Sequence, residues 1–263
     1  MNTLAVTRAP QFSPNAIEND RAIMQAVVCR LQLAGHDVII RSECELSHPL
    51  DFDICITMGR KPETLAWLRR QSGRIVNTPD AVSACSRSNL TRLMHLLGFP
   101  TAPDTDQGTG FWLKRGDACA QQPDDVMFCQ DETALALGIE QFKRRGITNY
   151  VVSAHVEGDL VKFYGVRGTD FFRYFYPTDD GQIKFGNERH NGPARHYPFS
   201  LDALHHDVTR LAAQVGIDVY GGDCIVRADG SYCIIDFNDW PSFSRCLGEA
   251  AKAIVQLIME RAV

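Results

Sequence analysis

The sequence predicts a mixed α and β protein, in which a small parallel sheet precedes lobes built from antiparallel strands and helices. In the first part of the chain, short apolar strands alternate with helices, which is typical of an open, mostly parallel sheet. Later, apolar strands follow one another directly across glycine-containing turns, as in antiparallel pairs. No internal repeat, low-complexity tract or long linker interrupts this order.

The elements of the first part are short and clearly bounded. The apolar positions Ile23, Val27 and Leu31 fall on one face of a helix, and Gly35 ends that helix. Gly73 and Pro79 mark the end of the sheet. We expect strands at 4–7, 38–40, 54–57 and 74–77, and helices at 23–34 and 62–70.

The middle and last parts contain longer antiparallel elements. Gly98 and Pro100 stop a helix that has leucines on one side. Several glycines and prolines make 177–198 a loop or a ragged edge. The final helix is amphipathic. We expect strands at 111–114, 126–128, 150–156, 160–166 and 171–176, and helices at 86–97, 132–144, 201–215 and 247–258.

A hairpin with two aspartates is the most informative feature. Asp229-Gly230 between two apolar runs is a strong signal for a two-residue turn, because glycine tolerates the positive φ that such turns require. Ala228 would then pair with Ser231, and Asp223 would lie opposite Asp236. Side chains opposed in this way have Cβ atoms roughly 4.5–5.5 Å apart on the same face.

This pair of carboxylates indicates a metal site. Asn238, two residues after Asp236, falls on the same face. Oxygen ligands of this kind suit Mg²⁺ or Mn²⁺ better than Zn²⁺. The alternative is a chance acidic pair on a solvated sheet face, but the surrounding strands are apolar on both faces, as in covered central strands. We expect Ile225 and Ile234 on the carboxylate face, and Cys224, Val226, Cys233, Ile235 and Phe237 on the other.

Composition excludes several classes of protein. The chain has 263 residues, 44% hydrophobic and 22% charged, and its net charge of −5 argues against a general nucleic-acid binder. We expect no membrane span and no signal peptide. The nine cysteines are odd in number and lack CxxC spacing, which favours reduced thiols in a cytoplasmic protein.

The order of the motifs resembles that of the ATP-grasp superfamily. Segment 96–103, with its helix end, glycine and prolines, resembles the entry into the first grasp lobe. Ser86-Arg87 stands where the family often has Asp-Lys, and Leu113-Lys114 resembles the second phosphate-binding lysine. Segment 151–156 resembles the strand against which adenine lies, and 235–243 resembles the signature that ends the metal site.

The resemblance implies an α+β ATP-grasp fold that uses ATP and Mg²⁺ or Mn²⁺. It divides the chain into a pre-ATP-grasp α/β domain (1–85), a small grasp lobe (86–156) and a large grasp lobe with the metal site (157–263), the two lobes clamping the nucleotide. The implied metal ligands are Asp223, Asp236 and Asn238. The implied nucleotide-binding residues are Arg87, Lys114, Ser153, His155, Val156, Glu157 and Asp159.

Some of these residues also have simpler interpretations. Glu157 and Asp159 would accept hydrogen bonds from ribose hydroxyls, or would be ordinary surface charges. The imidazole of His155 has no metal-ligand spacing to other histidines and is interpreted as structural. Asp239 is interpreted as a cap for the turn at Pro241.

The resemblance also assigns three catalytic candidates. Lys162 would project towards the nucleotide or the transferred group. Arg173 lies in a strongly apolar strand, where a guanidinium needs an anionic partner, and similar family members use an arginine near here to hold the acyl phosphate or the acceptor carboxylate. Arg189 belongs to a basic stretch that would recognise an anionic small-molecule substrate, or that would simply coat a surface loop.

The sequence departs from the ligase pattern in three places. Asp236 stands where the ligases commonly have glutamate. The inositol trisphosphate kinases of the same superfamily have aspartate at this position, as this chain does. Segment 160–164 resembles those kinases as well. Segment 117–124 lacks the usual glycines and serines of the phosphate loop.

Three functions therefore stay open. The first is an ADP-forming carboxylate–amine ligase that works through an acyl phosphate, which is the majority chemistry of the superfamily. The second is a small-molecule kinase that phosphorylates a hydroxyl, and the third is a nucleotide-binding module without turnover. The acceptor is not identified, and a homo-oligomer is possible because family members are often dimers or tetramers.

Overall fold

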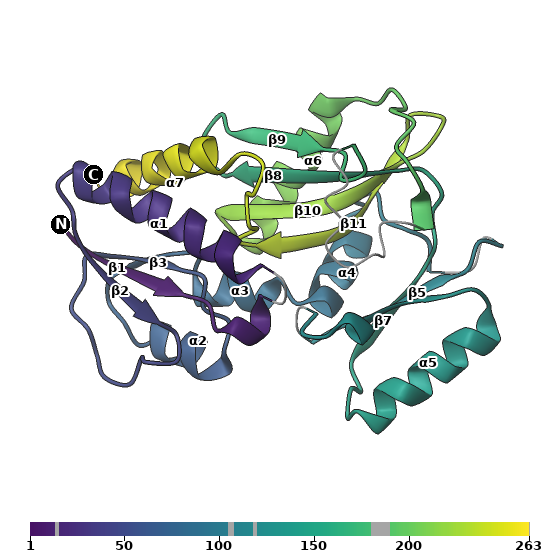
Figure 1. The fold of residues 1–263 in the computed structure, drawn as a ribbon, viewed down its shortest axis with the longest axis horizontal. Helices are drawn as coiled ribbons and strands as arrows, with labels where there is room; N and C mark the ends of the chain where they lie inside the picture. Colours follow the sequence, from purple (N-terminus) through teal and green to yellow (C-terminus); the bar gives the residue numbers. More distant parts are fainter. Residues whose placement is uncertain (14–15, 105–107, 118–119, 180–189, 263) are drawn as a thin grey trace.

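The computed structural model describes residues 1–13, 16–104, 108–117, 120–179 and 190–262. Within these residues the strands form three sheets, two of four strands and one of three. Figure 1 shows the N-terminal sheet at one end of the molecule, the larger C-terminal sheet in the middle and the small sheet at the other end. Both chain termini lie at the N-terminal end of the molecule.

The first sheet is parallel, as the alternation of strands and helices predicts. Its elements are β1 (Asn2–Thr7), η1 (Pro10–Phe12), α1 (Ile17–Leu33), β2 (Asp37–Ser42), β3 (Ile54–Thr57), α2 (Pro62–Leu68), β4 (Arg74–Val76) and α3 (Pro79–Ala84). The strand order is β2-β1-β3-β4, which leaves β2 at one edge. Helix α3 was not predicted. The Thr78 side chain caps its start by accepting from Ala81 N, and Pro79 occupies its first position. Threonine followed by proline is a common helix start, so the sequence did contain a signal for this helix.

The middle lobe is an antiparallel sheet with one covering helix. It consists of α4 (Arg87–Leu96), β5 (Phe111–Arg115), η2 (Pro123–Asp125), β6 (Val126–Cys129), α5 (Glu132–Arg144) and β7 (Tyr150–Ala154), with strand order β6-β5-β7. Phe142 of α5 is fully buried against Leu113 and Cys129. The strands and helices expected between 86 and 156 are confirmed within a few residues.

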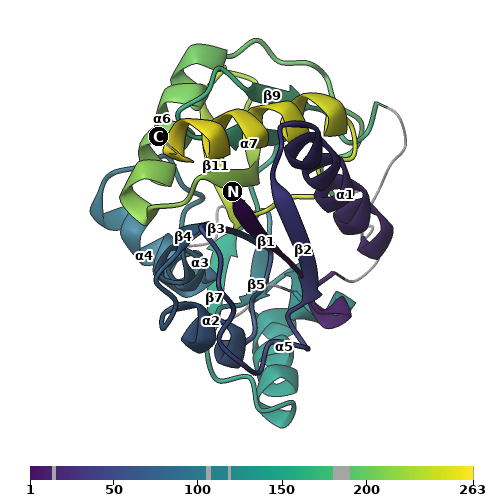
Figure 2. The same ribbon diagram turned by 90° about the vertical axis from the view of Figure 1, so that its left-hand side faces the viewer.

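The large sheet has the order β11-β10-β8-β9 and is antiparallel throughout. Its elements are β8 (Asp159–Val166), β9 (Phe172–Phe175), α6 (Leu201–Val215), β10 (Val219–Val226), β11 (Tyr232–Asp239) and α7 (Leu247–Ala262). α6 packs on one face through Val208 and Leu211. α7 packs on the other face and also against α1 of the first sheet (Figure 2), so the chain's last helix joins the large lobe to the N-terminal domain.

The aspartate pairing in the hairpin is confirmed, but its turn differs from the prediction. Asp223 lies opposite Asp236. Arg227 N, however, donates to Ser231 O at 2.8 Å, so the turn has one more residue than expected. Gly230 adopts φ +81° there, a conformation that favours glycine. A bulge between Asp223 and Cys224 then restores the predicted register.

The bulge changes which side chains share a face. Ile234 packs with the core under α6 and not beside the carboxylates, whereas Ile235 and Cys233 pack with Ile225 on the carboxylate side. Our assignment of these three β11 residues was therefore wrong. The physical reason is the extra residue on β11, because side chains alternate between the faces of a strand. The backbone of Ile234 instead donates to Pro100 O at 2.8 Å.

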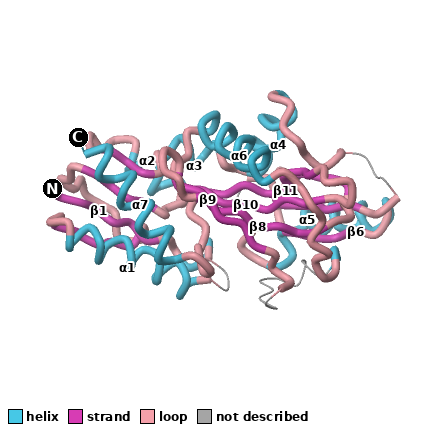
Figure 3. The backbone as a smooth tube through the Cα atoms, turned by 90° about the horizontal axis from the view of Figure 1, so that it is seen from above, coloured by secondary structure: helices cyan, strands magenta, loops and turns pink. Residues whose placement is uncertain are grey.

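The three sheets follow one another along the molecule, with α6 and α4 on one side of the long strands (Figure 3). The predicted boundaries at 85/86 and 156/157 fall between α3 and α4, and between β7 and β8. None of the described helices is both long enough and apolar enough to span a bilayer. The eight described cysteines are free thiols.

Candidate active site

A cavity of about 450 Å³ opens between the N-terminal loops and the two lobes. Residues from the first sheet, the middle lobe and the large lobe all line it. The cavity brings together nine of the predicted site residues, which come from α4, β5, β7 with the loop that follows it, and the large sheet. These are Arg87, Lys114, Ser153, His155, Val156, Lys162, Asp223, Asp236 and Asn238.

The two aspartates lie in a network of cations and an amide. Lys162 Nζ donates to Asp223 Oδ1 at 2.9 Å, and Asn238 Nδ2 donates to Asp236 Oδ2 at 2.9 Å. Arg87 Nη2 lies 3.6 Å from Asp236 Oδ1. Burial alone would raise the pKa of Asp236, but the nearby cations and the amide outweigh it and hold the pKa below its ordinary value.

The bulge in β11 also positions a lysine. Lys114 Nζ on β5 donates to the carbonyl oxygen of Ile235 at 3.0 Å, next to Asp236. The Lys114 side chain is buried, and burial together with the charge of Arg87 lowers its pKa. Burying an ammonium beside another cation is costly, and an anion bound in the cavity would offset that cost.

Arg87 has an unsatisfied donor. Its Nη1 donates to Arg115 O at 2.6 Å, but its Nε is buried and has no hydrogen-bond partner among the described residues. Buried donors are nearly always paired in folded proteins. A buried Nε without a partner, on a guanidinium whose Nη2 lies 3.6 Å from Asp236 Oδ1, therefore fits a site that binds an anionic ligand.

The strand end at 153–156 forms an aromatic-walled part of the cavity. Trp112 Nε1 donates to His155 Nδ1 at 3.0 Å, which places the proton of neutral His155 on Nε2. Burial, and next the neighbouring His190, lower the pKa of His155. The backbone of His155 bonds to Gly110 and Thr109, so its peptide groups are fixed in place.

Solved structures share this architecture over the whole chain. The D-alanyl-alanine synthetase A from Vibrio cholerae O1 biovar eltor str. N16961 matches with a TM-score of 0.72 and 10% identity, over 100% of this chain and 98% of that one. The RimK domain protein ATP-grasp from Sphaerobacter thermophilus DSM 20745 matches with a TM-score of 0.64 and 15% identity, over 98% and 99%.

A third match is the D-alanine–D-alanine ligase from Bacillus anthracis complexed with ATP, with a TM-score of 0.67 and 11% identity over 100% of this chain and 98% of that one. The chain has the ATP-grasp fold. No protein-family model matches the sequence, and no curated protein matches it.

Within this ATP-grasp fold, the predicted acidic site fits Mg²⁺. Among the described residues, no group of three or more His, Cys, Asp or Glu side chains is placed to hold a metal ion. Asp223, Asp236 and Asn238 instead offer two carboxylates and an amide oxygen. Mg²⁺ commonly takes one or two carboxylates and completes its octahedron with waters and substrate phosphates.

Two predicted nucleotide contacts have other surroundings. Asp159 is buried, and its carboxylate accepts from Arg195 N at 2.6 Å and from Tyr197 N at 2.8 Å. It therefore holds the segment before α6 and does not line the cavity. Glu157 is exposed and is not among the cavity-lining residues either. The ribose contacts predicted for these two carboxylates are not supported by their positions.

The two predicted catalytic arginines fall outside the cavity lining or outside the described residues. Arg173 forms an ion pair with Glu249 of α7, and its side chain is 46% exposed. The anionic partner that its apolar strand requires is therefore supplied by the protein here, and the catalytic contact expected of Arg173 stays a prediction. Arg189 lies outside the described residues.

The sequence reasoning missed an arginine network at the other end of the cavity. Arg60 Nη2 lies 2.6 Å from Asp239 Oδ1, and Arg8 Nη2 donates to Trp240 O at 2.9 Å. Arg8 also pairs with Asp20 at 3.3 Å. Asp239 thus anchors the N-terminal domain to β11, and the turn cap that we expected at Pro241 is not its main role.

A signal for these arginines exists in the sequence. Arg8 follows β1 and Arg60 follows β3, and β1 and β3 are adjacent parallel strands. Residues at the carboxyl ends of adjacent parallel strands meet at one edge of a sheet, where α/β proteins bind ligands.

Proposed function

We propose that the protein is an ATP-dependent ligase that activates a carboxylate as an acyl phosphate and joins it to an amine. Its fold is that of solved ligases, one of them complexed with ATP. The observation that carries the proposal is local to the cavity. Paired carboxylates face buried cations there, and one of those cations, Arg87, has a buried donor without a partner among the described residues.

The nucleotide would lie between the two lobes. Ser153, His155 and Val156 line the end of the cavity that would receive adenine. Arg87 and Lys114 would neutralise phosphate oxygens, which would also explain why these two basic side chains lie in a largely buried place. Lys162 lies close enough to Asp223 to be shared between that carboxylate and a phosphoryl oxygen.

Asp223, Asp236 and Asn238 would hold Mg²⁺. Bound there, the ion would neutralise charge on the phosphoryl oxygens during transfer. The neighbouring cations lower the pKa of Asp236 and so keep its carboxylate ionised well below neutral pH, in the form that binds a metal ion.

The acid substrate would occupy the part of the cavity next to the N-terminal domain. Arg8, Arg60 and Arg245 line this part, together with the hydroxyls of Ser242 and Ser244. Guanidinium groups and hydroxyls suit a small anionic substrate. Its carboxylate oxygen would attack the γ-phosphorus as the bond to the ADP oxygen breaks. The amine nitrogen would then attack the acyl carbon, phosphate would leave, and the ammonium proton would pass to solvent.

Phosphorylation of a hydroxyl is the alternative that Asp236 suggests. None of the three structures compared above is named a kinase. The test is incubation with ATP, Mg²⁺, hydroxylamine and a panel of small acids. A ligase yields a hydroxamate together with ADP, whereas a stable phosphate ester without hydroxamate would point to the kinase.

A matched pair of variants separates turnover from simple nucleotide binding. Asp236→Asn removes a cavity carboxylate, and Asp170→Asn removes an exposed one from the turn between β8 and β9. We expect acid-dependent ADP formation to disappear in the first variant and to stay at the wild-type level in the second. ADP formation that is equal in all three proteins would overturn the proposal.

A further inference from the structure

The open edge of the first sheet carries unusual side chains. β2 is the edge strand of the sheet, and both Ile39 and Ile40 are exposed, at 44% and 40%. These two residues lie on opposite faces of the strand, so apolar surface is exposed on both faces of the edge. Exposed edges of this kind are templates for pairing with another strand.

The backbone of β2 is arranged for such pairing. The amide of Asp37 donates to Met1 O, just before β1, and the amide of Glu43, just after β2, donates to Thr7 O of β1. Since peptide groups alternate in direction along a strand, those of Val38 and Ile40 point away from β1, towards the open edge. The Ile40 carbonyl accepts from the exposed guanidinium of Arg41 in the isolated chain.

The charges on β2 are self-complementary. Asp37 and Arg41 lie at equal distances on either side of Ile39, and neither forms an ion pair with a described residue. If a second copy pairs antiparallel about Ile39, Asp37 faces the partner's Arg41 at both ends of the ladder. The outward-pointing Val38 then exchanges backbone hydrogen bonds with the partner's Ile40. A parallel copy would lose this match of charges.

Helix α1 provides the additional surface that a stable interface requires. Ala22, Ala26, Cys29 and Leu33 share one helix face, and Leu33 is 89% exposed. Ala26 and Val38 pack against the same core, so this face lies beside β2, as Figure 2 illustrates. A two-fold axis through Ile39 would bring the two α1 helices together on one side of the joined sheet. A five-residue ladder alone would fall short of a typical interface area.

We propose that the protein forms a homodimer in which the β2 strands of two copies pair antiparallel, with Asp37 facing the partner's Arg41. The first sheets of the two copies then form one continuous sheet. This interface is independent of the ligase chemistry, because no residue of β2 lines the catalytic cavity. Such a contact is isologous and closes after two copies.

Charge reversal tests both the interface and its direction. Asp37→Arg or Arg41→Asp alone places like charges opposite each other twice per dimer. We expect each variant to dimerise roughly 10- to 100-fold more weakly than the wild type. An equimolar mixture of the two variants restores both opposite-charge pairs, so sedimentation equilibrium should show heterodimers at a protein concentration at which each variant alone is mainly monomeric.

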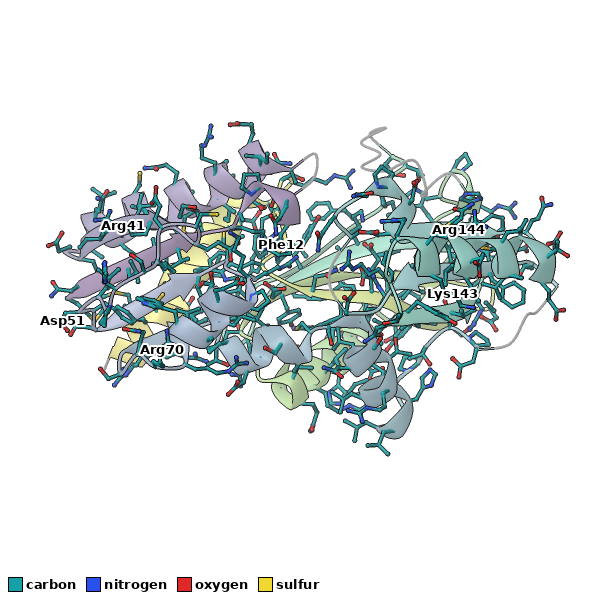
Figure 4. All side chains as sticks on the ribbon, turned by 90° about the horizontal axis from the view of Figure 1, so that it is seen from below. Phe12, Arg41, Asp51, Arg70, Lys143 and Arg144 are labelled. Carbon is teal, nitrogen blue, oxygen red and sulfur yellow. The ribbon has the colours of Figure 1, made fainter. Side chains whose placement is uncertain are left out.

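Arg144→Glu is the matched control, because Arg144 is exposed on α5 at the far end of the molecule from Arg41 (Figure 4). This variant should dimerise like the wild type. A wild-type protein that remains monomeric at about 100 μM would overturn the proposal. It would also be overturned if the single variants stayed dimeric, or if their mixture stayed monomeric.

Discussion

Asp236→Asn is the substitution whose consequences the structure defines best. The amide oxygen of the new side chain can still accept from Asn238 Nδ2, so the local hydrogen bond is retained. The lost interaction is the attraction to Arg87 at 3.6 Å and to the buried Lys114. Because the Asp236 side chain is 24% exposed, we expect a loss of only about 1 kcal/mol in the free energy of unfolding.

Activity should fall much further than stability. Removing one charged ligand from the phosphoryl-transfer site is expected to lower kcat by about 100-fold or more. The assay is acid-dependent ADP formation measured across an Mg²⁺ titration, alongside a thermal melt that should shift by roughly 2–4 °C. Activity within a factor of about three of the wild type would refute the assignment of Asp236.

The stability effect has a defined pH dependence. The folded-state pKa of Asp236 lies below its ordinary value, so its ionised form stabilises the folded protein above the pKa of the unfolded chain. That contribution is lost as the pH falls through the folded-state value. The difference between wild type and Asp236→Asn should therefore be constant from pH 7 to about pH 5 and shrink below about pH 4.

Four further substitutions test other parts of the site. Lys114→Met should weaken ATP binding about 10-fold or more in calorimetry. It should leave the free energy of unfolding within about 1 kcal/mol of the wild-type value, because the lowered pKa of Lys114 means that its buried charge destabilises the folded protein. A loss above about 2 kcal/mol would contradict this. Burial and His190 lower the pKa of His155 in the folded protein below 6.5, so protonation of this residue opposes folding. His155→Asn should therefore lose less stability than the wild type in urea melts as the pH falls from about 7 to 5. Equal losses in the two proteins would contradict this prediction. Asp159→Asn should cost about 1–3 kcal/mol in urea unfolding, with Glu157→Gln near zero, because of these two carboxylates only Asp159 is buried and accepts two backbone amides. Equal effects of the two substitutions would contradict the structural role of Asp159.

Local patterns were sufficient for most of the fold. Periodicity and glycines placed the elements because helix and strand repeats are encoded within a few residues. The pairing of Asp223 with Asp236 was also predicted correctly, but the predicted turn was one residue too short. The compensating bulge accompanies the contact of Ile234 N with Pro100 O, a partner more than a hundred residues away in the chain. No local pattern encodes that contact.

The differences between the expected and the observed surroundings of the site residues have the same origin. The sequence indicated that Arg173 needs an anion, but the anion is Glu249, which only the packing of α7 on the large lobe brings near. Likewise, Arg60 and Asp239 meet across the junction between two domains. Sequence reasoning identifies residues that require partners, whereas tertiary packing decides whether the partner is the protein or a ligand.

Calorimetric titration with a non-hydrolysable ATP analogue tests the central claim most directly. We predict saturable binding that depends on Mg²⁺ and that Arg87→Met weakens about 10-fold or more, because the orphaned Arg87 Nε finds its acceptor on the nucleotide. Arg92→Met, an exposed change on the same helix, should bind like the wild type. Absence of binding, or binding indifferent to both Mg²⁺ and Arg87, would contradict the account.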